Sequence, residues 1–360
     1  MRHLLLTYKQ LYFSNTGYWY FLLACTVMIS SCKKNHYQNR QNENKLVVLA
    51  EVSAGDSAFI PVAKSFIAGS GNPIAFEKIN NASVIIAGEN ETERQLRFNN
   101  ASEFNSNPAS IYSHPAIFKY NTGYTLKIDH PEWGSVTATT HIPASFFVKN
   151  VRSEEGNFRG KEVLNFSFDI ADAANEVNYY MFEAVKQLVH LSRYFIWQGV
   201  RYDYDTQTGK DLYEILEDED DTDISLRQDT VATNTYIRLN VFTGDAKTDN
   251  INIGSLDSSF RRIFIRDSLF NGESYSTTFS VAMDHFEAVN PQEKGIIAVR
   301  IKSVDKAFYH YMLQYEKYKT DFGKMPVAQL SSPAGNIQNG LGIFGGSCKK
   351  EWKFFYDDLE

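Results

Sequence analysis

From Lys45 onward the chain is a series of short apolar or alternating runs separated by Gly, Asn, Ser and Pro. Runs of this length, bounded by turn-forming residues and rich in β-branched and aromatic side chains, are typical of antiparallel strands. The pattern therefore predicts a mainly β protein. The predicted strands lie within 45–52, 58–68, 82–88, 124–129, 135–143, 163–170, 178–185, 190–197, 235–242, 261–267, 275–283 and 295–304.

The pattern also indicates a boundary near residue 145. The runs 124–129 and 135–143 follow one another across a turn that contains Pro and Gly, which predicts a hairpin. Pro143 has no N–H to donate to a strand ladder, so the second strand is expected to end there.

One helix is predicted after the last of these strands. Its apolar positions recur at the spacing of a single helical face, and Ser303 is the expected N-cap. The residues on that face are Val304, Phe308, Tyr311, Met312 and Tyr315.

These elements predict two β-sandwich-like domains of immunoglobulin or fibronectin type with one C-terminal amphipathic helix. The first domain is expected over 45–145 and a second, β-rich domain over 146–347. The second domain would contain an acidic insertion at 202–223 and the helix at 304–319. A tail would follow over 348–360.

The N-terminal segment has the form of an export signal. Arg2 and Lys9 precede an apolar run of about a dozen residues, too short to span a bilayer. The run ends on Ile29-Ser30-Ser31-Cys32, which is similar to a bacterial lipobox. We predict a signal peptide over 1–31, lipidation of Cys32 and a polar tether over 32–44. The alternatives are an ordinary signal peptide with an incidental cysteine and a buried N-terminal helix.

Charge and cysteine content exclude several classes of protein. The net charge of −7 becomes −9 once Arg2 and Lys9 leave with the signal, which argues against a nucleic-acid partner. With Cys25 in the signal and Cys32 lipidated, Cys348 alone remains, so no intramolecular disulfide is expected. No Cys/His cluster predicts a zinc site.

The acidic insertion holds the candidate metal ligands. Asp203, Asp205, Asp218 and Asp220 supply hard oxygen atoms of the kind that calcium prefers. The segment lacks the glycine that a helix–loop–helix calcium loop has at its sixth position. A solvated, mobile insertion is the alternative interpretation, and no other cofactor is expected.

Catalytic motifs are missing from the sequence. It contains neither a Gly-x-Ser-x-Gly elbow nor a His-Glu-x-x-His zinc motif. Paired carboxylates of a glycosidase are not excluded, but acidic residues are too common to indicate one. Trp133, Trp197 and Tyr202 are candidates for stacking on sugars, with core packing as the alternative. We therefore predict that the protein is not an enzyme.

The segment 336–346, NIQNGLGIFGG, is rich in glycine. Glycine permits positive φ and close backbone approach. Gly340, Gly342, Phe344 and Gly345 are candidates for a loop that meets a partner. The alternative is a tight terminal loop tucked against the second domain.

Four motifs occur in an order that resembles a known family. They are YTLKI…SVTATTHIP at 124–143, NYYMF at 178–182, DSLFNGESY at 267–275 and NIQNGLGIFGG at 336–346. Together they resemble a Bacteroidota family of outer-membrane lipoproteins known as domain of unknown function 4249. The resemblance covers roughly 45–347. It implies an outer-membrane lipoprotein, often encoded beside a TonB-dependent receptor, and it supplies no catalytic residues.

Three functional hypotheses follow. The first is a lipid-anchored, non-catalytic accessory of TonB-dependent nutrient uptake that binds the receptor or its cargo. The second is a stand-alone glycan- or peptide-binding surface module, and the third is a hydrolase with an unrecognised carboxylate site. The expected location is the outer membrane, and the sequence leaves open whether the protein lies on its periplasmic or its cell-surface face.

Overall fold

The computed structural model describes residues 45–65, 78–100, 109–174, 176–218, 224–256, 258–285, 295–322, 324 and 332–355. All of them belong to one compact unit. The predicted signal peptide, the tether with Cys32, and Asp220 lie outside the described residues. No helix within the described part of the chain is long and apolar enough to cross a membrane.

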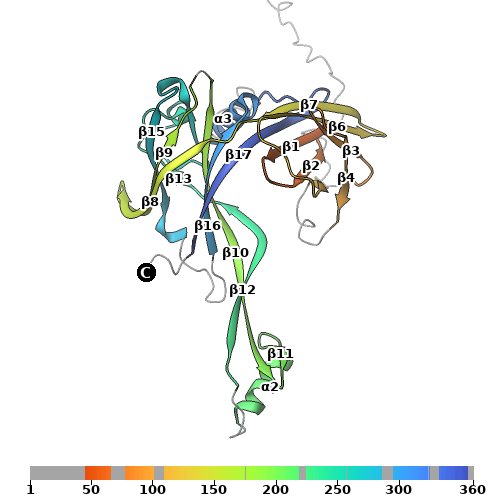
Figure 1. Cartoon of the computed structure of the whole chain (residues 1–360), viewed down its shortest axis with the longest axis vertical. Coiled ribbons are helices and arrows are strands. Elements are labelled where there is room, and N and C mark those ends of the chain that lie inside the picture. The colour runs from red at the N-terminus through yellow and green to blue at the C-terminus, as the bar shows by residue number, and fades with distance from the viewer. Residues whose placement is uncertain are drawn as a thin grey trace, which may run out of the picture. The chain divides into compact units, whose positions relative to one another are not determined.

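The fold is mainly β, as the sequence predicted, and consists of two sheets (Figure 1). The larger sheet has the strand order β11-β10-β16-β17-β1-β2-β5-β4-β3-β6-β7, with β12 and β14 also paired to β10. The smaller sheet has the order β13-β15-β9-β8.

In the first half of the chain the strands are β1 (Leu46–Ser53), β2 (Ala58–Lys64), β3 (Ser83–Gly88), β4 (Arg94–Asn99), β5 (Ser110–His114), β6 (Thr122–His130), β7 (Gly134–Ile142), β8 (Phe147–Phe158) and β9 (Lys161–Ala171). They are followed by β10 (Tyr179–Trp197), β11 (Val200–Asp203), β12 (Arg227–Arg238), β13 (Val241–Phe242), β14 (Ile263–Arg266), β15 (Ser274–Ala282), β16 (Gly295–Val304) and β17 (Leu341–Phe355). In the described residues the helices are α2 (Gln207–Glu217) and α3 (Lys306–Asp321), with short 3-10 turns at Asp249–Asn252, Asp267–Leu269 and Met283–His285.

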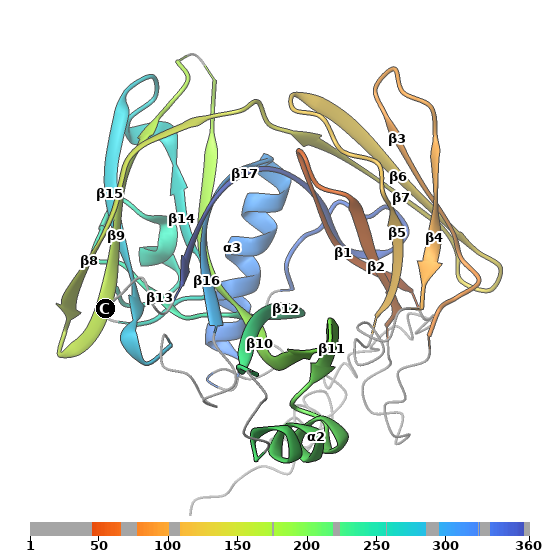
Figure 2. The ribbon, with the colours of Figure 1, turned by 60° about the horizontal axis from the view of Figure 1, so that its bottom comes forward.

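The predicted C-terminal helix is confirmed as α3, with its start shifted by two residues. Val304 still belongs to β16, and the N-cap is Asp305 rather than Ser303. The reason is local, because the Asp305 carboxylate accepts hydrogen bonds from the backbone N–H groups of Ala307 and Phe308. Figure 2 shows α3 lying beside β16 and β17.

Two hydrophobic cores lie on either side of the predicted boundary near residue 145. One is built mainly from β1 to β7, and the other from β9, β10, β14 to β16 and α3. The larger sheet nevertheless runs through both cores, because β17 pairs in parallel with β1 and antiparallel with β16. Phe344 packs in the first core, and Ile343 and Cys348 pack in the second.

Strand β17 replaces part of the predicted tail. Residues 348–355, which the sequence assigned to the tail, belong to this strand. The cause is packing, since Cys348 is fully buried and Trp352 and Phe354 lie against the second core.

The glycines of β17 allow its backbone to approach its neighbours closely. Gly342 has φ +104, and a Cβ there would collide with the carbonyl oxygen of Val48 on β1. A Cβ at Gly345 would collide with the ring of Phe308 on α3. These positions therefore set the distances from β17 to β1 and to α3.

A network of buried and partly buried ions joins the strands around β17. Lys302 on β16 lies 2.7 Å from Glu183 on β10 and 2.9 Å from Glu51 on β1. Glu183 also contacts Arg238 and Arg262, and Arg262 reaches Glu316 on α3 at 2.7 Å. The three carboxylates and three cations balance, as buried charges must.

The environment of Glu183 favours its ionised form. Burial alone would raise the pKa of its carboxyl, but Coulombic attraction from Lys302, Arg238 and Arg262 outweighs burial and holds that pKa well below its usual value.

We expect Gly345→Ala to reduce the free energy of unfolding by about 1–3 kcal/mol, because the added methyl group overpacks the contact with Phe308. Urea denaturation of the full chain in detergent measures the change. Gly254→Ala is the matched control, since its Cβ would meet only Thr320 at 3.9 Å. Equal losses of unfolding free energy in the two variants would contradict the close contact between Gly345 and Phe308.

We expect Glu183→Gln to cost about 3 kcal/mol of unfolding free energy at pH 7, because it leaves buried cations uncompensated. A depressed pKa contributes stability above the unfolded-state value, and that stability is lost as the pH falls. The difference between wild type and variant should thus be constant above the usual pKa of 4.5 and shrink below it. Urea titrations between pH 3 and pH 7 test this, and a pH-independent difference would contradict it.

Candidate functional site

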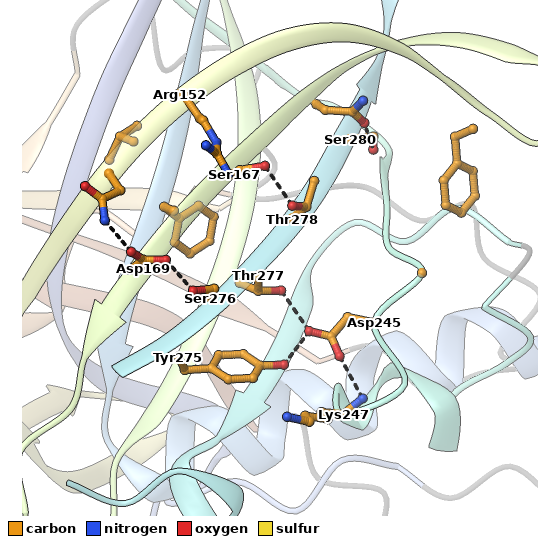
Figure 3. A pocket seen from close by; sticks show the side chains of 16 residues that line it. Arg152, Ser167, Asp169, Asp245, Lys247, Tyr275, Ser276, Thr277, Thr278 and Ser280 are labelled. Atoms are coloured by element: carbon orange, nitrogen blue, oxygen red, sulfur yellow. Dashed lines mark hydrogen bonds between the residues drawn. The ribbon is translucent and has the colours of Figure 1, made fainter. Parts of the chain in front are cut away.

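A pocket of about 970 Å³ lies over the smaller sheet (Figure 3). Strands β8, β9 and β15 and the segment after β13 supply its walls. Its lining residues are Asn150, Val151, Arg152, Phe158, Asn165, Ser167, Phe168, Asp169, Gly244, Asp245, Lys247, Tyr275, Ser276, Thr277, Thr278 and Ser280.

The polar character of the pocket follows from alternation along β9 and β15. On β9, Leu164, Phe166, Phe168 and Ile170 are buried in the core. The residues between them therefore face the other side of the sheet, because successive side chains in a strand point in opposite directions. These intervening residues are Asn165, Ser167 and Asp169, and their partners across the ladder are Ser280, Thr278 and Ser276.

Each of these cross-strand pairs is hydrogen-bonded. Ser276 Oγ donates to Asp169 Oδ1 at 2.5 Å, and Ser280 Oγ donates to Asn165 Oδ1 at 2.6 Å. The hydroxyls of Ser167 and Thr278 are 2.7 Å apart. The result is a ladder of polar groups held in place across two strands.

A second polar cluster forms around Asp245, on the other side of β15 from Asp169 (Figure 3). The Asp245 carboxylate accepts hydrogen bonds from the hydroxyls of Tyr275 and Thr277 and from the backbone N–H of Lys247. Burial, and then the hydrogen bond to Asp245, raise the pKa of Tyr275 well above its usual range. Tyr275 therefore remains a neutral hydrogen-bond donor.

A β-bulge in β8 shapes the third wall. The register with β9 shifts between Lys149 and Arg152, and Asn150 adopts the left-handed conformation with φ +52. Its amide Nδ2 donates to Asp169 Oδ2 at 2.5 Å. Hydrogen bonds from Ser276 and from Asn150 hold the pKa of Asp169 below its usual value, so this carboxylate stays ionised.

The arrangement is suited to binding a polar molecule by hydrogen bonds. Hydroxyl, amide and carboxylate groups line the floor, and Arg152 and Lys247 add positive charge at the walls. The ring of Phe158 supplies an apolar surface. Hydroxyl-rich ligands need this mixture of directed donors, acceptors and a flat apolar contact.

The structure separates the predicted calcium ligands. Asp205 forms an ion pair with Arg193, with Oδ1 2.7 Å from Nη2, and Asp203 Oδ1 accepts the backbone N–H of Asp205. Asp218 is the C-cap at the far end of α2. An eleven-residue helix is about 16 Å long, which is too far for one ion to bridge.

In the part of the chain that the structure describes, no group of three or more His, Cys, Asp or Glu side chains is placed to hold a metal ion. Two regular elements, the end of β11 and the whole of α2, lie within the predicted insertion. Helix α2 begins where Thr206 caps it by accepting from the N–H of Gly209.

The predicted partner loop lies at the start of β17, with Gly340 just before the strand. Phe344 has no exposed surface, Gly345 is buried against Phe308, and Gly340 and Gly342 lie close to the backbone of β1. Phe344 and Gly345 are thus not presented to a partner.

The predicted sugar-stacking residues lie outside the polar pocket. The ring of Trp133 stacks on the ring of His130, with their centroids 4.0 Å apart. The ring centroids of Trp197 and Tyr202 are 6.2 Å apart on the ribbon formed by β10 and β11.

The sequence did not predict the pocket. The apolar positions of 163–170 and 275–283 predicted the strands, and the polar residues that alternate with them are among the residues that line the pocket. Their small hydroxyl and acidic side chains alternate on two strands that pair, but the pairing is not visible in the sequence.

The comparison with protein families matches the chain over residues 35–352 to the family described as Domain of unknown function (DUF4249). The chain belongs to the DUF4249 family. The comparison with curated proteins found no significant match. The DUF4249 assignment confirms the resemblance drawn from the four motifs, and the pocket gives this member of the family a candidate site.

We expect Asn150→Ala to destabilise the protein by about 1 kcal/mol more than Asn150→Gly. Both variants lose the hydrogen bond to Asp169, but alanine also retains the cost of the left-handed conformation. Urea denaturation of the two variants compares them directly. Equal stability would show that the bulge relaxes when the side chain is removed.

Proposed function

We propose that this protein is an outer-membrane-anchored lipoprotein and a non-catalytic accessory of TonB-dependent nutrient uptake. It holds a polar cargo molecule in the pocket over the smaller sheet. The observation that carries the proposal is this pocket, where the hydrogen-bonded ladder on β9 and β15 faces an open volume of about 970 Å³.

The chemistry of the pocket supports binding. The hydroxyls of Ser276 and Ser280 donate to Asp169 and Asn165, and no histidine is among the lining residues. A ladder fixed before a ligand arrives loses little side-chain entropy on binding. The pocket thus offers a preorganised polar surface.

A long ribbon supports contact with a second protein. Beyond Leu188, strand β10 pairs within the described chain only with β12 and β11, and Figure 1 shows this ribbon leaving the main body with α2 near its end. Phe195 packs there against Tyr202 and Tyr213, so the ribbon has a small core of its own.

The end of the ribbon exposes apolar side chains. Ile196, Val200 and Ile215 are 39%, 52% and 59% exposed. Apolar groups gathered at the end of a projecting element suit protein contact. The partner that we propose is a TonB-dependent receptor, which the family resemblance implies is often encoded beside such a protein.

The first test is affinity purification of the tagged full chain from detergent-solubilised outer membranes, followed by mass spectrometry of proteins and small molecules. We expect a TonB-dependent receptor in near-stoichiometric amount and one polar small molecule. Thr278→Trp fills the pocket from an exposed position on β15 and should remove the small molecule but keep the receptor. Glu162→Trp, also exposed but outside the lining, is its control.

A shortened ribbon separates the two roles. Val189 and Ala232 are paired, so an Asn-Gly turn in place of residues 190–231 closes the hairpin there. This variant should lose the receptor and keep the small molecule. The proposal fails if no receptor co-purifies and deletion of the protein leaves uptake unchanged.

A stand-alone glycan-binding module is the second candidate, favoured by the hydroxyl, amide and carboxylate lining together with Phe158. It predicts that the full chain purifies without a receptor but binds glycans on an array. Thr278→Trp would abolish that binding and Glu162→Trp would not.

A further inference from the structure

A smaller pocket of about 370 Å³ lies where β1, β16 and β17 run side by side. It is separate from the polar pocket over the smaller sheet, and the two share no lining residue. Its walls are Glu51, Ser53, Asp56, Ser57, Phe59, Arg300, Lys302 and Lys349.

Three cations and two carboxylates line this pocket, and each cation is anchored. Lys302 is held between Glu51 and Glu183, Lys349 pairs with Asp56, and Arg300 Nε donates to Glu351 at 2.6 Å. The pairs fix the positions of the cations without using all of their donors.

The groups of this pocket that still lack hydrogen-bond partners in the described chain are mainly donors. A guanidinium has five N–H donors, and among the described residues only the Nε–H of Arg300 has an acceptor. An ammonium has three, and Lys349 uses one on Asp56. The Ser57 hydroxyl has no hydrogen-bond partner in the described chain. Both oxygens of Glu51 are already occupied by Lys302 and Ser347.

Ser53 provides the second observation. Its side chain is among the buried polar groups, with the residue 6% exposed, and its Oγ has no hydrogen-bond partner among the described residues. A buried hydroxyl that is left unpaired destabilises the folded protein. An acceptor placed in the pocket within reach of a rotated Ser53 hydroxyl would remove that destabilisation.

We propose that this pocket binds the oxyanion group of a small molecule, a carboxylate or a phosphate. Arg300 and Lys349 supply charged donors, and Ser53 and Ser57 supply hydroxyl donors. The ring of Phe59, which is 49% exposed, forms an apolar wall for the rest of the ligand. This site does not depend on the proposed role in nutrient uptake.

The test is isothermal titration calorimetry of the full chain in nonionic detergent, at pH 7 and low ionic strength. Inorganic phosphate and acetate are titrated separately, so that the tighter binder identifies the oxyanion. We expect Lys349→Gln and Arg300→Gln to weaken binding about tenfold each, because each loses a charged hydrogen bond. Absence of binding by both probes to the wild type overturns the proposal.

The control for charge is Lys353→Gln, which removes the same charge from an exposed side chain on β17 outside the pocket. It should bind like the wild type, and weakening equal to that of Lys349→Gln would overturn the site by showing a diffuse charge effect.

Ser53→Ala separates a ligand role from a structural one. It should weaken binding about threefold or more, yet leave the unfolding midpoint without ligand unchanged or raised, because it removes an unpaired buried hydroxyl. Binding equal to that of the wild type, or a lowered midpoint without ligand, overturns the part assigned to Ser53 and with it the site.

Discussion

The close parallel pairing of β1 with β17 is the constraint on which the rest of the structure depends. It brings the first strand of the described chain beside the last one, in register from Val47 with Leu341 to Ser53 with Ser347. The same strand β17 also pairs with β16, so the two cores share one continuous sheet. Asp305 reinforces the junction. Its carboxylate caps α3, accepts the N–H of Gly346 and accepts the hydroxyl of Thr140 at 2.5 Å. One side chain thus connects the helix, β17 and β7.

The two pockets arise from different parts of this arrangement. The second core covers one face of the smaller sheet, so the polar side chains that alternate with Phe166 and Phe168 are left on the other face. The ladder of hydroxyls and acids there is what makes the larger pocket polar. The smaller pocket lies at the β1–β17–β16 junction itself, because Ser53 and Lys349 come from strands that only this pairing brings together.

The sequence predicted the parts of the fold that depend on local pattern. Alternation along 163–170 and the helical spacing from Phe308 to Tyr315 correspond to β9 and α3. It did not predict the contacts between distant segments. The glycines near Gly342 looked like a loop, because the carbonyl of Val48 that requires a glycine there lies almost three hundred residues earlier. The acids of the insertion suggested a metal site, because the sequence does not show that α2 separates Asp205 from Asp218. Neither pocket was predicted, since each is assembled from strands whose pairing is set by tertiary structure.

Charge compensation explains why the two ends of the ionic network differ. Around Glu183, with Arg262 extending to Glu316 on α3, cations and carboxylates match in number, and a bare charge there would be costly. Toward Arg300 and Lys349 the side chains reach solvent, with 21% and 28% of their surfaces exposed. Water can satisfy spare donors at that edge at little cost, so the fold tolerates more donors than acceptors there. The spare donors of Arg300 and Lys349 can therefore be hydrated when no ligand is bound and can bind a ligand when one is present. The charge-balanced interior, in contrast, holds β10, β16 and α3 together.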